Sequence, residues 1–471
     1  MTKGQKRAGV AGAAAAVVLA AGLFARGRAP QGRPDVLLLT IDTLRADRLG
    51  CYGSATGSSP RIDALAASGV VFDNAACPMP LTRPSHFSMM TGLYPRQHGV
   101  LNNQGTLPDP VPTVAEAFAE AGYRTAAFVG VRLLAADSGA GQGFEVLEAP
   151  PGASWTADEV GRRAVDWVLD APAAREPFFL WVHLFDPHMP YAPPAAFAPP
   201  ATPDGADLPE VSWRRLVELA GRDDGRLSRQ TLDRALALYD GEVAFTDHWV
   251  GRVLDAVDGR RGRKAAVAFT ADHGECFDHG IYFEHSDCLY DGALKVPLIL
   301  RGAEQERAGE RRTRQVENLD LAATLLEMAG LAPSAAFTRP SLLAADGGAG
   351  GRAFFQHPLY AEHSAQNRVR RQEQIRSVAG EATRPLRPGQ DELGVRTERW
   401  KYIRSRAKEE LYDLRADPAE RANRAAEEAA VRARMKEALA AWTRTHPLNV
   451  AAEGPINERL KETLRSLGYL Q

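Results

Sequence analysis

The sequence predicts an α/β fold with a mainly parallel sheet sandwiched by helices, followed by a smaller C-terminal α+β subdomain. From residue 36 onward, apolar runs of strand length alternate with helical patterns, which is typical of a parallel sheet covered on both faces. Two of these apolar runs end in acid, at Asp42 and Asp272. The chain of 471 residues is 45% hydrophobic and 25% charged, a composition that suits one large domain or two packed ones.

The individual elements follow from the same patterns. Strands are expected at residues 36–41, 70–72, 125–129, 178–184, 265–270, 296–300, 359–362 and 400–404. Helices are expected at residues 61–68, 113–121, 158–169, 228–257 and 418–443. Residues 187–224 are rich in Pro, Ala and Asp and are expected to form a long loop that shapes substrate access.

Three parts of the chain are expected from composition. Residues 1–30 form a targeting segment, residues 31–335 the main domain with both acidic strand ends, and residues 353–471 the C-terminal subdomain with its terminal helix. The break between the last two contains Pro, Gly and Ser.

The N-terminus has the pattern of a signal peptide or an uncleaved signal anchor. Lys3, Lys6 and Arg7 precede residues 8–25, which carry no charge and are rich in Ala, Val and Leu. This stretch is slightly short for a bilayer span, which needs about 20 residues, and Arg26 and Arg28 after it disfavour cleavage. We expect an extracytoplasmic protein, periplasmic or on the cell surface, tethered to the membrane by residues 8–25.

The net charge argues against nucleic-acid binding, and the cysteine spacing argues against a cysteine zinc site. The formal net charge of −2 gives no basis for nucleic-acid binding, which normally shows a basic excess. The four cysteines, Cys51, Cys77, Cys276 and Cys288, allow three pairings. None lies in a Cys-x-x-Cys spacing, so a cysteine zinc site is not expected.

Thr82 opens a segment that turns from loop into helix, Leu81-Thr82-Arg83-Pro84-Ser85-His86. We expect its hydroxyl at the helix N-cap, where Ser and Thr are favoured and where backbone N–H groups attract anions. A hydroxyl held there beside a metal can attack a phosphate or sulfate ester. The alternative is that Thr82 only caps the helix.

The two acidic strand ends point to the same place. In open α/β sheets, ligands bind at the carboxyl ends of the strands. Asp42 follows one apolar run and Asp272-His273 follows another. The fold therefore brings carboxylates and an imidazole together.

Several motifs occur in one order between about residue 35 and about residue 423. They are Asp42 with Leu49-Gly50-Cys51-Tyr52-Gly53, Thr82 to His86, Thr91-Gly92-Leu93-Tyr94-Pro95, His183 to His188, Asp272-His273-Gly274-Glu275, and Leu411-Tyr412-Asp413-Leu414. In this order they resemble the sulfatase family of the alkaline-phosphatase-like superfamily. The resemblance implies that fold and a hydrolase or transferase of phosphoric or sulfuric esters.

The position of Thr82 departs from the usual pattern of that family. Most members carry Cys or Ser there, in a Cys-x-Pro-x-Arg frame, and oxidise it to formylglycine. Threonine cannot form that aldehyde, and His86 stands where arginine is expected. Cys77 offers no displaced frame, because Met79 stands where proline is needed. The chain instead resembles the threonine-nucleophile branch, in which the threonine oxygen binds a divalent metal and forms a phospho-enzyme.

This resemblance implies one divalent metal ion, held by Asp42, Asp272, His273 and the Thr82 hydroxyl. Thr43 replaces the second aspartate that sulfatases carry after Asp42. Mixed nitrogen and oxygen ligands suit Mn or Zn better than Ca, with Mg also open.

Five further residues are expected at the site. His86 follows Thr82 by one helical turn and is expected to orient or stabilise its oxygen. By resemblance, His188 is the acid/base or leaving-group contact, and His285 takes the place of a lysine that binds the substrate anion. His183 and Arg132 are further substrate contacts, with a core histidine and a surface arginine as the respective alternatives.

The favoured function is a metal-dependent hydrolase or transferase that acts on a phosphoester or phosphodiester through Thr82 and a covalent intermediate. One alternative is a sulfuric-ester hydrolase that works without formylglycine. A second alternative is a non-catalytic, envelope-anchored binding protein that kept the fold. The expected substrate is an anionic ester of a glycan, a lipid headgroup or a small molecule, and no pattern indicates an oligomeric state.

Overall fold

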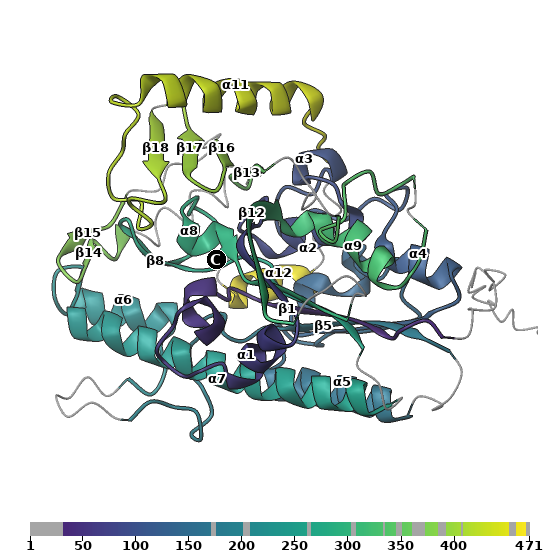
Figure 1. The fold of residues 1–471 in the computed structure, drawn as a ribbon. Helices are drawn as coiled ribbons and strands as arrows, with labels where there is room; N and C mark the ends of the chain where they lie inside the picture. The colour runs from purple at the N-terminus through teal and green to yellow at the C-terminus, as the bar shows by residue number, and fades with distance from the viewer. Residues whose placement is uncertain are drawn as a thin grey trace, which may run out of the picture.

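The structure is a computed structural model in which residues 32–170, 176–200, 208–260, 265–302, 308–332, 335–344, 351–359, 373–384, 392–406, 408–451 and 458–467 are described (Figure 1). The predicted signal or anchor segment, residues 8–25, lies outside these residues, as do residues 360–362 of the predicted strand 359–362. Within the described part, no helix combines the length and the apolar character that a membrane span requires.

The centre of the molecule is a nine-stranded sheet with the order β10-β2-β11-β7-β1-β5-β3-β4, in which β12 also pairs with β2. Pairing is parallel from β7 through β1, β5 and β3 to β4, whereas β11 is antiparallel to both β7 and β2. The predicted α/β architecture is confirmed. The strands are β1 (Val36–Ile41), β2 (Val70–Ala76), β3 (Arg124–Val129), β4 (Val146–Glu148), β5 (Phe178–Leu184), β7 (Ala266–Ala271), β10 (Lys295–Val296), β11 (Leu298–Arg301) and β12 (Glu310–Glu317).

Helices cover both faces of this sheet (Figure 1). Every residue of β1, β5 and β7 is therefore buried, and these strands are apolar except for Thr40, His183 and Thr270. One face is covered by α1 (Pro60–Ala67), α5 (Ala157–Asp170) and α7 (Arg229–Arg260). The other is covered by α2 (Thr82–Thr91), α4 (Val114–Glu120) and α9 (Leu321–Met328).

The C-terminal subdomain is a four-stranded antiparallel sheet with one long helix across it. Its elements are β13 (Ala353–Gln356), β16 (Leu393–Arg396), β17 (Trp400–Arg404), β18 (Glu409–Asp413) and α11 (Ala429–Thr445). Buried charges join it to the main domain: Asp291 pairs with Arg396 at 2.8 Å and with Lys401 at 3.0 Å.

Short elements complete the chain. The β-strands are β6 (Arg226–Leu227), β14 (Ser377–Val378) and β15 (Glu381–Ala382) in one small sheet, and the hairpin of β8 (Cys276–Asp278) and β9 (Ile281–Glu284). The helices are α3 (Pro95–His98), α6 (Trp213–Gly221), α8 (Asp291–Leu294) and α12 (Glu458–Ser466), with 3-10 turns η1 (Ala46–Arg48), η2 (Gly50–Tyr52), η3 (Arg132–Leu134), η4 (Ala136–Ser138) and η5 (Asn318–Asp320). Cys276 and Cys288 form a disulfide, and Cys51 and Cys77 are free thiols.

Two expectations about secondary structure are wrong. The predicted loop 187–224 contains α6, whose N-cap Ser212 accepts a hydrogen bond from Arg215 N–H. The predicted helix 418–443 begins only at Ala429. Before it, the side chains of Asp417 and Asn423 accept hydrogen bonds from backbone N–H groups, which favours turns over helix.

Helix α7 braces the loop that follows β5. Glu242 accepts a hydrogen bond from Ala192 N–H at 2.8 Å, and the Thr246 hydroxyl donates to the Asp186 carbonyl at 3.0 Å. Burial, with the charge of Asp186 nearby, raises the pKa of Glu242 to about 8. The loop thus rests on a carboxyl group that is protonated in the folded protein near neutral pH.

We predict that Glu242→Gln stabilises the protein at pH 8 and changes little at pH 5. Because the pKa of Glu242 is higher when folded than when unfolded, wild-type stability falls as pH rises from about 4.5 to about 8. Gln keeps the acceptor for Ala192 without the charge, so a gain on the order of 1 kcal/mol is expected at pH 8. Urea unfolding at both pH values measures it, with the half-exposed Glu218→Gln as control. Equal shifts at the two pH values would contradict the assignment.

Candidate active site

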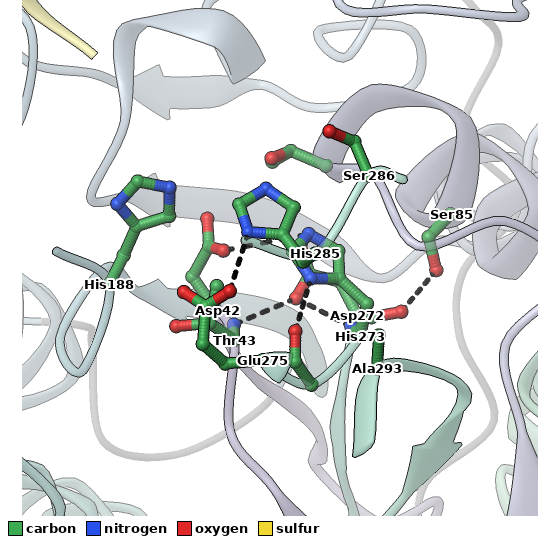
Figure 2. Close-up of polar contacts among 12 residues, drawn as sticks. Asp42, Thr43, Ser85, His188, Asp272, His273, Glu275, His285, Ser286 and Ala293 are labelled. Carbon is green, nitrogen blue, oxygen red and sulfur yellow. Dashed lines mark hydrogen bonds and ion pairs between the residues drawn. The ribbon is translucent and has the colours of Figure 1, made fainter. Parts of the chain in front are cut away.

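Three side chains meet at the carboxyl edge of the central strands. Asp42 follows β1, and Asp272 and His273 follow β7; their ligand atoms lie within 4.8 Å of one another (Figure 2). β1 and β7 are parallel neighbours with Ile41 opposite Ala271, so their ends coincide. His273 Nε2 lies 3.7 Å from Asp42 Oδ1 and 3.4 Å from Asp272 Oδ2.

The polar atoms of this cluster fit a divalent cation. Both carboxylate oxygens of Asp42, Oδ2 of Asp272 and Nε2 of His273 are buried without a hydrogen-bond partner. His273 Nδ1 lies 3.0 Å from the Gly274 carbonyl; a carbonyl can only accept, so Nδ1 carries the hydrogen and Nε2 a lone pair. Buried acceptors that face one another repel, and a bound cation would relieve that repulsion.

The pKa shifts agree with this donor set. Burial, and then the charge of Asp42, raises the pKa of Asp272 well above its usual range. Burial also opposes the charge of Asp42, yet His183, His188 and His273 hold its pKa below the usual range. Burial and the neighbouring His285 lower the pKa of His273 to about 3. His273 is therefore neutral, which is the form that binds a metal.

Helix α2 starts beside this cluster and carries Thr82 in its first turn. The Ser85 hydroxyl donates to the Asp272 carbonyl at 2.6 Å, and the Thr82 side chain is 1% exposed. The expectation that Thr82 is the N-cap is wrong. Leu81 has the extended backbone of the cap, and its carbonyl accepts from Ser85 N–H. Because Thr82 is the first helical residue, its hydroxyl is not used for capping, and it makes no hydrogen bond within the described chain.

His86 lies against the backbone of Thr82 rather than its hydroxyl. Its Nδ1 is 2.8 Å from the Thr82 carbonyl oxygen and 3.6 Å from Asp272 Oδ2, and its Nε2 is 3.2 Å from the Thr40 hydroxyl. Four-residue spacing on a helix directs the ring back over that carbonyl. Both ring nitrogens are occupied, so His86 acts on Thr82 through the main chain.

His188 and His285 line a cavity of about 420 Å³ next to the cluster. Figure 2 shows His285 over Asp272 and His273, with His188 to one side; the rings of His188 and His285 are 5.4 Å apart. Burial lowers the pKa of His188. Burial opposes the charge of His285 as well, but Glu275, 3.3 Å from its Nδ1, raises the pKa of His285. One imidazole of the cavity is thus biased toward the charged form and the other toward the neutral form.

Several residues of this cavity were missed by the sequence analysis. Glu275 belongs to the motif Asp272-His273-Gly274-Glu275, so its position was a signal for its contact with His285. Trp213 and Arg214 of α6, with Arg465 of α12, carried no such signal. They come from segments distant in sequence that only the fold places at the cavity.

Two predicted substrate contacts do not line this cavity. Arg132 pairs with Asp137 at 2.8 Å in the turn after β3. His183 is fully buried in β5, where its Nε2 lies 3.6 Å from Asp42 Oδ2.

Thr43, in place of the second aspartate, has φ 53 and donates its N–H to Asp272 Oδ1 at 3.3 Å. A left-handed backbone is uncommon for threonine and often marks a functional site.

Known proteins are similar to this chain in sequence and in fold. Residues 34–331 match the family described as Sulfatase. The Delta 4,5-hexuronate-2-O-sulfatase of Bacteroides thetaiotaomicron is 26% identical over 437 residues, which cover 83% of this chain and 85% of that protein. A solved 2-O GAG sulfatase has TM-score 0.65 at 22% identity over 88% of this chain and 92% of its own. The phosphonate monoester hydrolase of Agrobacterium radiobacter has TM-score 0.65 at 21% identity over 91% and 99%. The chain therefore belongs to the sulfatase family, a family of ester hydrolases.

Proposed function

We propose that the protein is a metal-dependent hydrolase or transferase that acts on phosphoesters or phosphodiesters through Thr82. The observation that carries this proposal is the set of buried, unpartnered donor atoms on Asp42, Asp272 and His273 next to the start of α2. A second support is the residue at position 82, since threonine cannot supply a formylglycine.

Asp42, Asp272, His273 and the Thr82 hydroxyl are the proposed metal-binding residues, and Mn or Zn suits them best, with Mg or Ca as alternatives. A divalent ion held there would lower the pKa of the threonine hydroxyl and offset negative charge on the ester oxygens. With His273 neutral and both carboxyl groups ionised, these side chains would carry two negative charges, which a divalent ion would balance.

The proposed chemistry is an in-line displacement by Thr82, with His188 and His285 of the neighbouring cavity as further contacts of the ester. The Thr82 oxygen, after loss of its proton to solvent, bonds to phosphorus while the bond to the leaving oxygen breaks. His285, which Glu275 biases toward the protonated form, donates a hydrogen bond to the ester oxygens. His188 lies within the same cavity and is the proposed contact of the leaving oxygen, which takes its proton from solvent. Water or an acceptor alcohol then resolves the phosphothreonine.

A sulfuric ester is the second candidate substrate. It is favoured by the hexuronate-2-O-sulfatase among the relatives, whereas the phosphonate monoester hydrolase shares the fold alone. Attack on sulfur by a threonine oxygen would give a sulfate ester on Thr82, which lacks the geminal hydroxyl that lets formylglycine expel sulfate. The phosphoric ester is therefore preferred.

A small ester panel tests the proposal. We predict that the protein loaded with Mn²⁺ or Zn²⁺ hydrolyses bis(4-nitrophenyl) phosphate or 4-nitrophenyl phenylphosphonate with kcat/KM at least about 100-fold above that for 4-nitrophenyl sulfate. A reversed preference would establish the sulfuric-ester alternative. No hydrolysis, together with no bound divalent ion, would support the non-catalytic binding protein.

We also propose an extracytoplasmic location with residues 8–25 as a tether. The charge pattern of residues 3–25 supports it, and the disulfide between Cys276 and Cys288 suits an oxidising compartment. Fractionation of cells that express the full chain, with protease added to intact spheroplasts, tests this: a protected protein would contradict it.

A further inference from the structure

A line of buried side chains connects Asp42 with the backbone of Thr82. Its centre is the hydroxyl of Thr40 in β1, two residues before Asp42. This oxygen lies 2.9 Å from Trp181 Nε1, 3.2 Å from His183 Nδ1 and 3.2 Å from His86 Nε2. Thr40 and the three partners are all fully buried. One hydroxyl thus joins β1, β5 and α2.

The two histidines of this line extend to the proposed catalytic residues. His183 Nε2 lies 3.6 Å from Asp42 Oδ2 and is buried without a hydrogen-bond partner, and Asp42 Oδ1 lies 3.7 Å from His273 Nε2. His86 Nδ1 lies 2.8 Å from the Thr82 carbonyl. The same hydroxyl therefore fixes a ring that contacts the Asp42 carboxylate and a ring that hydrogen-bonds to the Thr82 carbonyl.

The hydrogen-bonding capacity of Thr40 matches these contacts. The Thr82 carbonyl only accepts, so His86 donates from Nδ1, and the neutral ring accepts at Nε2. Thr40 donates its single hydrogen to that Nε2. Its oxygen then accepts from Trp181 Nε1–H and from His183 Nδ1–H. The hydroxyl uses one donor and two acceptor positions, which is all it has, so both histidine rings have a defined orientation.

We propose that Thr40 is a positioning residue that sets the metal affinity of the site by fixing the ring of His183, which contacts Asp42, and the ring of His86, which donates to the Thr82 carbonyl. The inference rests on the proposed metal-dependent function. Groups that orient metal ligands from behind change affinity by about 10–100-fold when they are removed. If Thr40 served only the packing of the core, its hydroxyl would affect stability and leave the metal affinity unchanged.

The experiment compares Thr40→Val with Thr40→Ser in the full chain. Val keeps the branched shape and loses the hydroxyl, whereas Ser keeps the hydroxyl. We expect Thr40→Val to raise the dissociation constant for Zn²⁺ or Mn²⁺ by about 10–100-fold, measured by chelator competition, and Thr40→Ser to stay within about threefold of wild type. In ¹⁵N spectra of the histidine rings, Thr40→Val should shift the signals of His86 and His183.

Thr125→Val is the matched control. Thr125 is a fully buried threonine in β3, whose hydroxyl donates to the Gly143 carbonyl at 2.8 Å and accepts from Glu145 N–H at 3.0 Å. It should lose stability and keep the wild-type metal affinity. His183→Asn keeps the test available if Thr40→Val does not fold, and the same loss of affinity is expected.

The outcomes separate this inference from the proposed function. If Thr40→Val or His183→Asn bound Zn²⁺ or Mn²⁺ as tightly as wild type does, the role of Thr40 would be overturned. The proposed function would still stand, because the wild type binds the metal. A wild type that binds neither ion would overturn the proposed function, and with it this inference.

Discussion

Replacing Thr82 with alanine is expected to lower the turnover of phosphodiester or phosphonate esters by at least about 1000-fold. The change removes the hydroxyl that would bond to phosphorus, from a side chain that is 1% exposed at the start of α2. Initial rates with bis(4-nitrophenyl) phosphate measure the loss. Intact-protein mass spectrometry of rapidly quenched wild type should show an adduct on Thr82 that the variant lacks.

Thr82→Ser is the control for this prediction, because it retains a hydroxyl at the same position. We expect it to keep measurable turnover and the quenched adduct. Thr82→Ala should unfold at a temperature close to that of wild type, since the Thr82 hydroxyl makes no hydrogen bond in the described part of the chain. Undiminished turnover in Thr82→Ala would show that another group is the nucleophile.

Replacing Asp272 with asparagine is expected to weaken metal binding by more than about 100-fold and to lower turnover in parallel. The metal-free variant should nevertheless be more stable than metal-free wild type above about pH 5, by on the order of 1 kcal/mol. Burial and Asp42 raise the pKa of Asp272 above its unfolded value, so the metal-free wild type loses stability as pH rises. Asparagine stays neutral, and its oxygen can still accept from the N–H groups of Thr43 and His273.

Asp35→Asn provides the comparison, since Asp35 is a buried aspartate at the opposite end of β1. It pairs with Arg260 at 3.0 Å, so its replacement should destabilise the metal-free and the metal-loaded forms alike. Metal content by elemental analysis and thermal unfolding with and without chelator give both readouts. An Asp272→Asn protein that is less stable than wild type without metal would argue against two buried, mutually repelling carboxylates.

The central strands were predictable because their burial is complete. β1 and β5 have the predicted bounds, and β7 is displaced by one residue. A strand covered on both faces is a continuous apolar run, which stands out from any flanking sequence. Helix α6 was missed because it is short and lies within a region of Pro and Asp. Helix α11 was extended too far because Ala and charged residues favour helix, whereas Asp417 and Asn423 bond backbone N–H groups in the turns before it.

Asp42, Asp272 and His273 could be assigned to one site from sequence because each directly follows an apolar strand, and parallel strands end at one edge. The residues next to them in the sequence gave no indication of which distant side chains contact them. Three features depend on the packing of segments up to several hundred residues apart. Thr40 contacts His86 and His183, Thr82 is the first helical residue after its cap, and α6 and α12 contribute to the cavity. The local sequence pattern predicts which residues are buried and where strands end. The hydrogen-bond partners of a buried polar group depend on the tertiary packing around it.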